Sequence, residues 1–526
     1  MNFFLIKKNI FLIIITISLV VNLTNLKNYG YAWDDGLMRL TGFVNLKYLV
    51  KKFYPNIENK FERLKKVPEL NKWRDRYYGP SFELFAASIE YLTGNISNNK
   101  NQDNKTDIYY LRCTILILLL HITYFFFFKT NIYISKNYIL SNISLLLLIS
   151  FPRFFAEQHY NTKDLYLCGL SIMIFYFGFK ILNKLKIKNI LLFSFFSALA
   201  ISTRLSATLM PSFIMFFFIL KNGINIKSFK ICGIVLFSFL VFFYISFPFL
   251  WESPLNNFIT VFNKLSNHSW NGYVLYLGNE YKNTETPWHY IPIWFIITTP
   301  IIYLIYFLIG LIYSVFIFFK NGIHRIAHTL DKYKFMYINL AIFLSTLFAL
   351  IFFQNNTYNG WRHSYFLFIC FLLFIVSFIS SHQSKIFKIF SKYLLFVLII
   401  SNIIWIYKNH PYENLYFNTL VKKPYQQFDL DWWGLSNYEQ IRFVLDFDKS
   451  NQIRIWAASG TSIKATTKNL LTLKEKDRII VVENKDDADY ILNNYINNLK
   501  DYSKEYKLIN ELKVSNSRIN SLYKIR

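Results

Sequence analysis

Charged residues are scarce in this 526-residue chain, and their scarcity excludes an ordinary soluble domain. Only 17% of the residues are Asp, Glu, Lys or Arg, against roughly 25% in soluble domains. The hydrophobic share is 54%, with 56 Phe and 38 Tyr, and the apolar residues gather in long runs. This composition is typical of a protein that crosses a membrane many times.

Cysteine is equally sparse, and its placement excludes two further classes. The four cysteines, at positions 113, 168, 232 and 370, all lie inside apolar runs. None is spaced for a disulfide framework or a metal cluster. No small-x-small cleavage site follows the first apolar run at 11–26. We therefore interpret that run as an uncleaved first membrane span and not as a signal peptide.

The net charge of +27 does not by itself indicate nucleic-acid binding, and we expect none. In polytopic proteins Lys and Arg gather in cytoplasmic loops and against anionic lipids. Every second loop of this chain is basic, and the positive-inside rule puts these loops in the cytoplasm with the N-terminus. Their basic residues include Lys7 and Lys8, Lys129 and Lys136, Lys184 to Lys188, Lys221 to Lys230, Arg325 to Lys334, and Lys385 to Lys392.

The apolar runs predict a mostly α-helical membrane domain over 1–407 with about 11 transmembrane helices. An odd number of spans leaves the C-terminal tail on the outer side. A first outer loop over 27–107 includes a helix at 78–92 that we expect to lie along the interface. The predicted spans are 11–26, 108–128, 138–151, 165–182, 190–202, 206–220, 231–250, 291–319, 337–353, 364–380 and 393–407.

The tail, 408–526, has a different composition. It is polar, and its pattern mixes helix and strand. Short strands are expected at 453–457 and 478–482, with a further strand or helix edge at 487–492. We find no phosphate-cradling glycine loop and no ligand-spaced Cys or His in it. The tail is therefore predicted to form a small α/β domain outside the membrane.

The unusual residues of the chain fall in the outer loops. Asp34 and Asp35 directly follow the first span, where carboxylates are costly unless solvated, paired or used. A polar cap that ends the span is the alternative interpretation. The segments 152–164, 251–289 and 358–363, and Arg204, add charges of both signs, His and Trp on the same face. This clustering favours a functional site over scattered structural caps.

Carboxylates opposed by arginines at a membrane surface suit sugar transfer from a polyprenyl-phosphate donor. A base removes a proton from the acceptor hydroxyl, which attacks the anomeric carbon. Arg matches the oxygens of the departing phosphate, and stabilising that group carries much of the rate. The candidates are Asp34, Asp35 and Asp164 for catalysis, Arg153, Arg204, Arg362 and His363 for the donor phosphate, and Glu83, Tyr160, Asn161 and Trp361 for substrate.

Two of these assignments compete with simpler ones. Arg204 could be an interfacial cation that only reaches to the headgroups. His159, His268 and His289 fit ordinary polar loop residues. No metal-ligand set is recognisable in the sequence, so we expect no cofactor and leave a divalent cation open.

Several short motifs, in order and on one side, resemble the GT-C glycosyltransferases of the protein O-mannosyltransferase and aminoarabinose transferase type. They are the acidic pair at 34–35, the helix opening with Tyr-Gly-Pro at 78–80, and the loop from 152 to 164. The segments 358–363, 410–418 and 428–436 resemble a bacterial branch of that superfamily. The resemblance covers nearly the whole chain.

The resemblance implies an inverting hexosyl- or pentosyltransferase of a bacterial inner membrane with a periplasmic active site. The first-loop acid, Asp34, would be the base, and Asp164 would also lie in the site. The family commonly has Asp-Glu where this chain has Asp34-Asp35. The donor would be a polyprenyl-phosphate sugar, and the acceptor a glycan, a lipid or a protein.

Two other functions remain in view. A transporter or flippase of a lipid-linked or anionic solute should carry charges at mid-membrane depth and often broken helices in symmetric halves. Here the charges lie at span ends, and we see no internal repeat. An outer-face binding module, with the tail as its working part, is the third interpretation.

Overall fold

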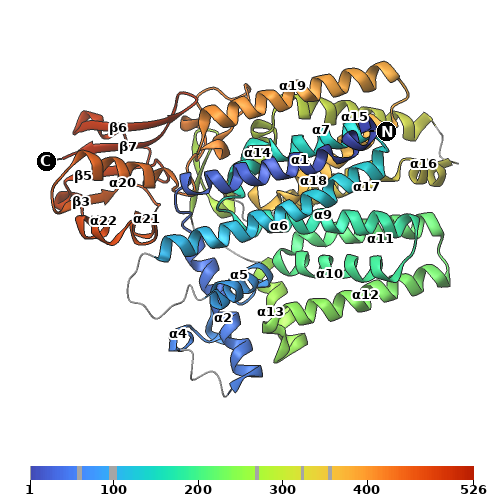
Figure 1. Cartoon of the computed structure of the whole chain (residues 1–526), viewed down its shortest axis with the longest axis horizontal. Helices are drawn as coiled ribbons and strands as arrows, with labels where there is room; N and C mark the ends of the chain where they lie inside the picture. Colours follow the sequence, from blue (N-terminus) through green and yellow to red (C-terminus); the bar gives the residue numbers. More distant parts are fainter. Residues whose placement is uncertain are drawn as a thin grey trace.

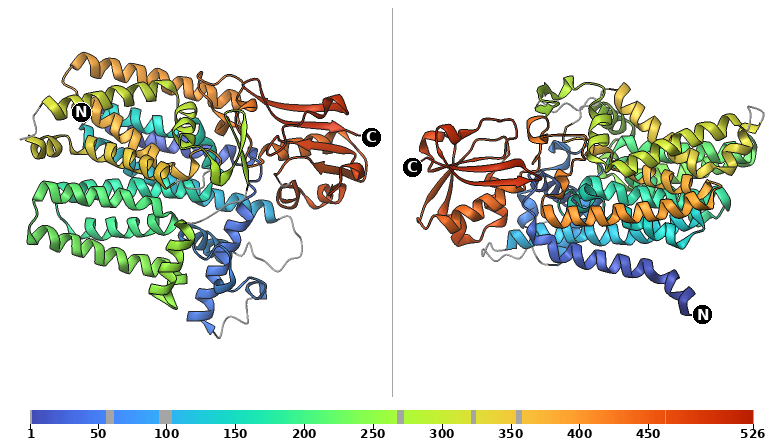
Figure 2. Two further views of the ribbon diagram at one scale, coloured as in Figure 1. Left: turned by 180° about the vertical axis from the view of Figure 1, so that it is seen from behind. Right: turned by 90° about the horizontal axis from the view of Figure 1, so that it is seen from above.

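A helical bundle and a smaller strand-containing lobe make up the molecule (Figure 1). The computed structural model describes residues 2–55, 62–93, 104–266, 272–320, 325–353, 358–461 and 463–525. The N-terminus lies at one end of the bundle, and the C-terminal lobe lies beyond the other end in every view (Figure 2). We call the end next to the lobe the outer end.

Eleven helices correspond to the eleven predicted spans. Within the described residues, eight are long and apolar enough to cross a membrane, and α7, α10 and α18 are shorter apolar helices. This confirms a polytopic, mostly helical fold. They are α1 (Asn2–Asn25), α6 (Asn104–Ser135), α7 (Tyr138–Ile149), α9 (Thr162–Asn183), α10 (Ile187–Thr203), α11 (Leu209–Asn222), α12 (Ile226–Ser246), α15 (Ile301–Lys320), α17 (Lys334–Phe352), α18 (Phe366–Ser381) and α19 (Lys385–Asn409).

The core of the bundle lies around α9 and α18. Every residue from Phe366 to Ile379 in α18 is buried, and α9 is buried along most of its length. A helix that is apolar on all sides is stable only where protein or lipid surrounds it. The outer helices, such as α12 and α19, expose rows of Phe, Ile and Leu instead. Those rows fit contact with lipid tails.

One predicted span is wrong in its extent. The apolar run 291–319 forms two helices, α14 (Tyr290–Thr298) and α15, which are separated by Thr299 and Pro300. Proline has no backbone N–H and its ring clashes with the preceding turn, so the helix ends there. Only α15 has the length of a membrane span.

The outer loops hold more regular structure than the sequence predicted. The helix expected at 78–92 begins at Ser81 and packs on α2, where a Cβ at Gly42 would lie 2.2 Å from the Glu83 carbonyl oxygen. The outer elements are α2 (Asp35–Phe53), α4 (Glu62–Lys65), α5 (Ser81–Leu92), α8 (Pro152–Glu157), α13 (Pro254–Ser266) and the hairpin of β1 (Tyr273–Tyr276) and β2 (Asn279–Lys282). The short helix α16 (Ile326–Lys332) lies at the opposite end.

The C-terminal lobe is a mixed five-stranded sheet with helices, so an α/β fold is confirmed. The strand order is β4-β3-β5-β7-β6, in which β3 is parallel to β4 and β5 and the last two strands form an antiparallel hairpin. That hairpin was not predicted. The elements are α20 (Ser436–Phe447), β3 (Ile453–Ala457), α21 (Ile463–Leu470), α22 (Leu473–Arg478), β4 (Ile479–Val482), β5 (Tyr490–Asn493), β6 (Lys507–Val514) and β7 (Ser517–Lys524).

The lobe packs tightly on the chain segment that follows α1. Tyr29 and Ala32 share an apolar cluster with Trp433 and Leu435. The closest approach is at Gly30, where an added Cβ would lie 2.1 Å from the Leu435 carbonyl oxygen. The fold of the tail therefore fixes the position of the segment that leads into Asp34.

We predict that Gly30→Ala loosens this packing. The methyl group would overlap backbone that has no room to move, and overpacking of this kind costs about 1–3 kcal/mol. The midpoint of thermal unfolding should fall, and limited proteolysis should cut the tail faster. Gly233→Ala is the control, because nothing lies within 4 Å of its added Cβ. Equal behaviour of the two variants would contradict the tight packing.

Candidate active site

A cavity of about 600 Å³ opens at the outer end of the bundle. Its walls come from the start of α2, the segment before α5, the turn between α8 and α9, the end of α10, the segment 358–363 and Trp433 of the tail. Nine of the eleven sequence-predicted site residues line it, namely Asp34, Asp35, Glu83, Tyr160, Asn161, Asp164, Arg204, Arg362 and His363.

Asp34 stands directly before α2 but does not cap it. Its side chain makes no capping hydrogen bond, and 34% of that side chain is exposed. The nearest cation is Arg362, whose Nη1 lies 3.6 Å from Asp34 Oδ2. An N-terminal carboxylate is also favoured by the helix dipole. Asp34 is thus an ionisable, solvent-reachable group that the fold does not use to end the first span.

Arg362 is held in place by aromatic rings. Its guanidinium lies 4.4 Å from the ring centre of Trp433 and 5.0 Å from that of Tyr358. The side chain is 5% exposed, so packing restricts its orientation. A guanidinium fixed in this way at a cavity wall is ready to bind an anion without losing further rotamer freedom.

Asp35 points to a different partner than its neighbour. Its carboxylate is buried, and Oδ1 lies 3.5 Å from Nε of the fully buried Arg112 in α6. Burial raises the pKa of Asp35, and the charges of Arg112 and Arg39 oppose that rise. The pair joins α2 to α6 inside the protein. Asp34, by contrast, faces the cavity.

Asp164 and Arg204 form a second ion pair in the cavity. Arg204 ends α10 and donates from Nε to Asp164 Oδ1 at 2.8 Å, with Nη2 bonding the same oxygen. Asn161 caps α9 by accepting the Asp164 N–H, and its amide also reaches Asp164 Oδ2 at 3.1 Å. Arg204 therefore lies in the cavity wall, bonded to a carboxylate of the protein.

The amide of Asn161 also links the cavity to a buried acid behind it. Asn161 donates to Glu157 Oε2 at 2.7 Å, and the Tyr365 hydroxyl donates to Glu157 Oε1 at 2.5 Å. Burial raises the pKa of Glu157, and the hydrogen bonds from Tyr365 and Asn161 oppose that rise. Hydrogen bonds from Asn161 to Glu157 on one side and to Asp164 on the other therefore fix the loop before α9.

A lysine that the sequence analysis did not select also lines the cavity. Nζ of Lys163 lies 3.4 Å from the ring centre of Tyr78, and burial raises the pKa of Tyr78 to about 12. Glu83 is buried nearby, and its pKa is raised by burial and lowered by the charge of Lys163. Tyr160 places its ring 5.6 Å from that of Trp433, and His363 packs edge-on against Tyr358.

Arg153 and Trp361 lie outside the cavity. Arg153, in α8, packs over the rings of Trp294 and Phe417 at 5.4 and 5.6 Å. Trp361 is 2% exposed and donates from Nε1 to Thr298 Oγ1 at 2.8 Å. Both side chains are buried in the protein core, although Trp361 directly precedes Arg362 in the sequence. The helical turn at 362–364 sends adjacent side chains in different directions.

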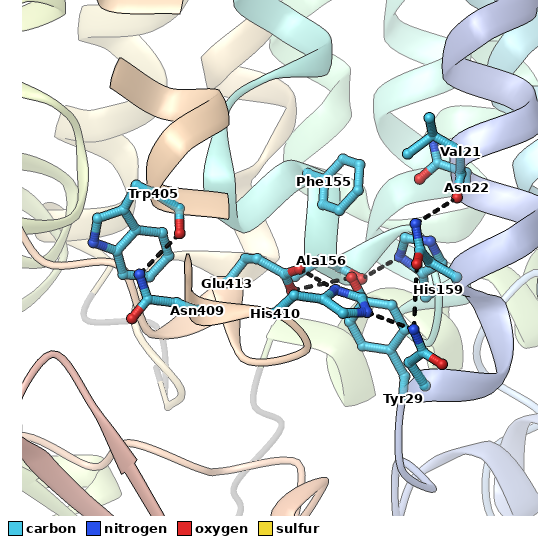
Figure 3. A network of polar contacts seen from close by, with 12 residues as sticks. Val21, Asn22, Tyr29, Phe155, Ala156, His159, Trp405, Asn409, His410 and Glu413 are labelled. Carbon is cyan, nitrogen blue, oxygen red and sulfur yellow. Dashed lines mark hydrogen bonds and ion pairs between the residues drawn. The ribbon is translucent and has the colours of Figure 1, made fainter. Parts of the chain in front are cut away.

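A buried polar network holds the segment before Asp34 against the tail (Figure 3). The Tyr29 hydroxyl donates to Glu413 Oε2 at 3.0 Å, and His410 Nδ1 lies 2.6 Å from Glu413 Oε1. Burial raises the pKa of Glu413, against the influence of His410. The ring of His159 stacks on Tyr29, and burial lowers the pKa of His159 to about 3. These histidines serve the packing and not the cavity.

Three contributors to this region were missed from the sequence. Arg112 falls within the predicted span 108–128, although a charge inside an apolar run is itself a signal. Lys163 and Trp433 lie in the motif segments 152–164 and 428–436, and only the fold brings them to the cavity. In the described residues, no group of three His, Cys, Asp or Glu side chains is arranged to hold a metal ion.

The comparisons with known proteins include a structural similarity that spans nearly the full length of the chain. No family model matches the chain, and no curated protein sequence matches it. Its structure is similar to the crystal structure of ArnT from Cupriavidus metallidurans bound to undecaprenyl phosphate. The match covers 98% of each chain with a TM-score of 0.46 and 9% identity.

We predict that the Asp35–Arg112 contact is a structural pair. Arg112→Met should lower the free energy of unfolding by about 3–5 kcal/mol, because it leaves a buried carboxylate unpaired. Adding Asp35→Asn to that variant should restore part of the loss, since the two sites are coupled. Thermal unfolding of the purified protein measures both effects. Arg325→Met, at an exposed site near the opposite end, is the control, and strictly additive losses would contradict the pairing.

Proposed function

We propose that the protein transfers a sugar from a polyprenyl-phosphate donor to an acceptor hydroxyl at the outer face of a membrane. One observation carries the proposal. A solvent-reachable carboxylate, Asp34, lies 3.6 Å from the buried guanidinium of Arg362, within a cavity at the end of an apolar helix bundle. The cavity contains a candidate base and two arginines, and it lies at the end of the apolar helices, next to lipid.

The reaction is a single displacement. Asp34 accepts the proton of the acceptor hydroxyl, and the oxygen forms a bond to the anomeric carbon. The bond from that carbon to the phosphate oxygen breaks, and the electron pair leaves with the polyprenyl phosphate. Attack opposite the leaving group inverts the anomeric centre. The products are the glycosylated acceptor, the lipid phosphate and a protonated Asp34.

Arg362 and Arg204 stabilise the leaving phosphate. Both already contact carboxylates of the cavity, so a phosphate adds to or replaces an existing ion pair. Asp164 and Asn161 position Arg204 through the hydrogen bonds described above. In a site that excludes bulk water, such prepositioned donors lower the barrier without reorganising during the reaction.

The remaining cavity residues have proposed roles in binding. Glu83, Tyr160 and His363 line the space next to Asp34 and offer polar groups to sugar or acceptor hydroxyls. Lys163 adds a third cation on the side of Arg204. Asp35 supports the loop through Arg112, and Arg153 and Trp361 take no part.

The setting of the reaction follows from the same argument. The basic loops lie at the end of the bundle away from the cavity, so the positive-inside rule puts the cavity on the outer side. We propose a bacterial inner membrane, a cytoplasmic N-terminus, and a periplasmic site and tail. On this view the chain is a GT-C hexosyl- or pentosyltransferase with its membrane domain at 1–407 and a periplasmic domain at 408–526.

A transporter is the weaker alternative. Asp164 lies in the first turn of α9 and Arg204 at the end of α10. Charges at helix ends next to an outer cavity fit interfacial chemistry, whereas a transport site needs them near the midplane.

We predict that Asp34→Asn lowers transfer by at least about 10²-fold, because the amide cannot accept the proton. The assay supplies a panel of polyprenyl-phosphate sugars and measures released lipid phosphate. Unfolding temperature and monodispersity should match the wild type. Asp331→Asn, which removes a carboxylate at the opposite end of the bundle, is the control. Wild-type transfer by the Asp34 variant would exclude it as the base.

We predict that Arg362→Lys, which keeps the positive charge, weakens both binding of the donor phosphate and its stabilisation as it leaves. Lysine cannot reproduce the planar fork or the packing on Trp433 and Tyr358. The rate constant for transfer should fall about 10-fold or more, and inhibition by added polyprenyl phosphate should weaken. Arg325→Lys should leave both unchanged. If Arg362→Lys affects neither rate nor inhibition, the phosphate lies elsewhere.

A further inference from the structure

A second large cavity lies at the end of the bundle away from the candidate active site. It is an open groove of about 680 Å³ between α6, α9 and α10. The short connection from α9 to α10 closes its end, on the same side of the bundle as the N-terminus (Figure 1). We call it the basic groove. Nothing in the proposed reaction uses it.

The walls of the basic groove are apolar and aromatic. Phe126 of α6 packs edge-on against Tyr176 of α9, at 5.0 Å between ring centres. Phe177 and Phe196 stack across α9 and α10 at 5.8 Å. These four side chains line the groove and are only partly covered, apart from the more buried Phe177. An apolar channel that stays open between helices offers a surface to a hydrocarbon chain.

The rim of the basic groove is strongly cationic. Lys180, Lys184, Lys186 and Lys188 line it, and the last three are exposed. Its described lining includes no carboxylate. Lys180 lies 4.2 Å over the ring of Tyr176, so one cation extends onto the aromatic wall. Four like charges around one opening repel one another unless an anion is present.

A polar side chain lies at the point where such an anion would sit. Asn189 lines the groove and is only 9% exposed, and an amide N–H at that place can donate to an anion. Asn189 lies in the first turn of α10, which has no acidic residue and whose N-cap residue, Lys186, makes no side-chain capping hydrogen bond. Lysines oppose the dipole at this end, whereas a bound anion complements it.

We propose that the basic groove binds an anionic glycerophospholipid, with its phosphate at Lys184, Lys186, Lys188 and Asn189 and one acyl chain along Phe126, Tyr176 and Phe196. The aromatic wall explains why a lipid fits better than a free phosphate. From Lys188 to Phe196 along α10 is a rise of about 12 Å, which would leave a bare phosphate in contact only with the rim. Basic pockets between helices at a cytoplasmic surface are suited to lipid headgroups.

The test measures which lipid the full-length protein retains. Purified protein in neutral detergent is equilibrated with equal amounts of phosphatidylglycerol and phosphatidylcholine, and native mass spectrometry counts bound lipids. Wild type should retain phosphatidylglycerol at least 5-fold over phosphatidylcholine. The triple variant Lys184→Gln/Lys186→Gln/Lys188→Gln should lose that preference. Lys385→Gln/Lys388→Gln/Lys392→Gln, which removes the same charge from another basic segment, should keep it.

A second variant fills the groove without altering its charge. Leu192→Trp adds bulk at the apolar wall, so retention of phosphatidylglycerol should fall about 5-fold while the lysines remain. Unfolding temperature and transfer activity should stay at wild-type values, because the groove lies apart from the cavity. Both results together support a headgroup site with an acyl channel.

Three outcomes would overturn the proposal. Equal loss of lipid in the two triple variants would mean general electrostatic attraction and not a site. Equal retention of the two lipids by the wild type would mean that no anion is recognised. A third arm offers inorganic phosphate and a polyprenyl phosphate to the wild type and to the Lys184→Gln/Lys186→Gln/Lys188→Gln variant. Preferential retention of either that this variant loses would reject the glycerophospholipid, whereas retention that the variant keeps belongs to the outer cavity.

Discussion

Charge in a low-dielectric surrounding is stable only when it is paired, and this constraint shapes the outer end of the molecule. Asp35 and Arg112 are both buried and face each other, and Asp164 is bonded to Arg204. The unpaired alternatives would cost several kcal/mol for each ion. Asp34 lies 3.6 Å from Arg362, and a third of its side chain is in solvent. Of these three carboxylates, Asp34 is thus the one that solvent reaches.

The tail contributes to this arrangement although it lies outside the bundle. Tyr29 and Gly30 are fixed against Glu413 and Leu435, and Trp433 supplies the ring on which Arg362 rests. The acid and the arginine therefore take their positions from the same domain contact. This coupling disfavours the view of the tail as an independent binding module.

Two features of the sequence carried the predictions. Local hydrophobic runs predicted the fold, and the few charges at the ends of these runs predicted the site. Hydrophobic runs located the membrane helices, and only 291–319 was misjudged because hydropathy does not register the break at Pro300. Asp34, Asp164, Arg204 and Arg362 were selected because charge at a span end is unusual. Arg153 was expected in the site as a cation of the second outer loop, and Trp361 as a residue of the segment 358–363. A place in an outer loop does not determine which way a side chain points. Lys163 reaches the cavity only through contacts distant in sequence. Arg112 has a local signal, a charge inside an apolar run. The hairpin of β6 and β7 turns within the two residues Ser515 and Asn516, so it too is local in sequence.

The most direct test is the structure of the protein with a polyprenyl phosphate bound, determined by cryo-electron microscopy in lipid. We predict phosphate density in the outer cavity, within hydrogen-bond distance of Arg362 and Arg204, with the first prenyl units running toward the bundle and Asp34 facing the open side. Phosphate density elsewhere at saturating ligand, with the cavity empty, would contradict the assignment of this cavity as a glycosyl-transfer site.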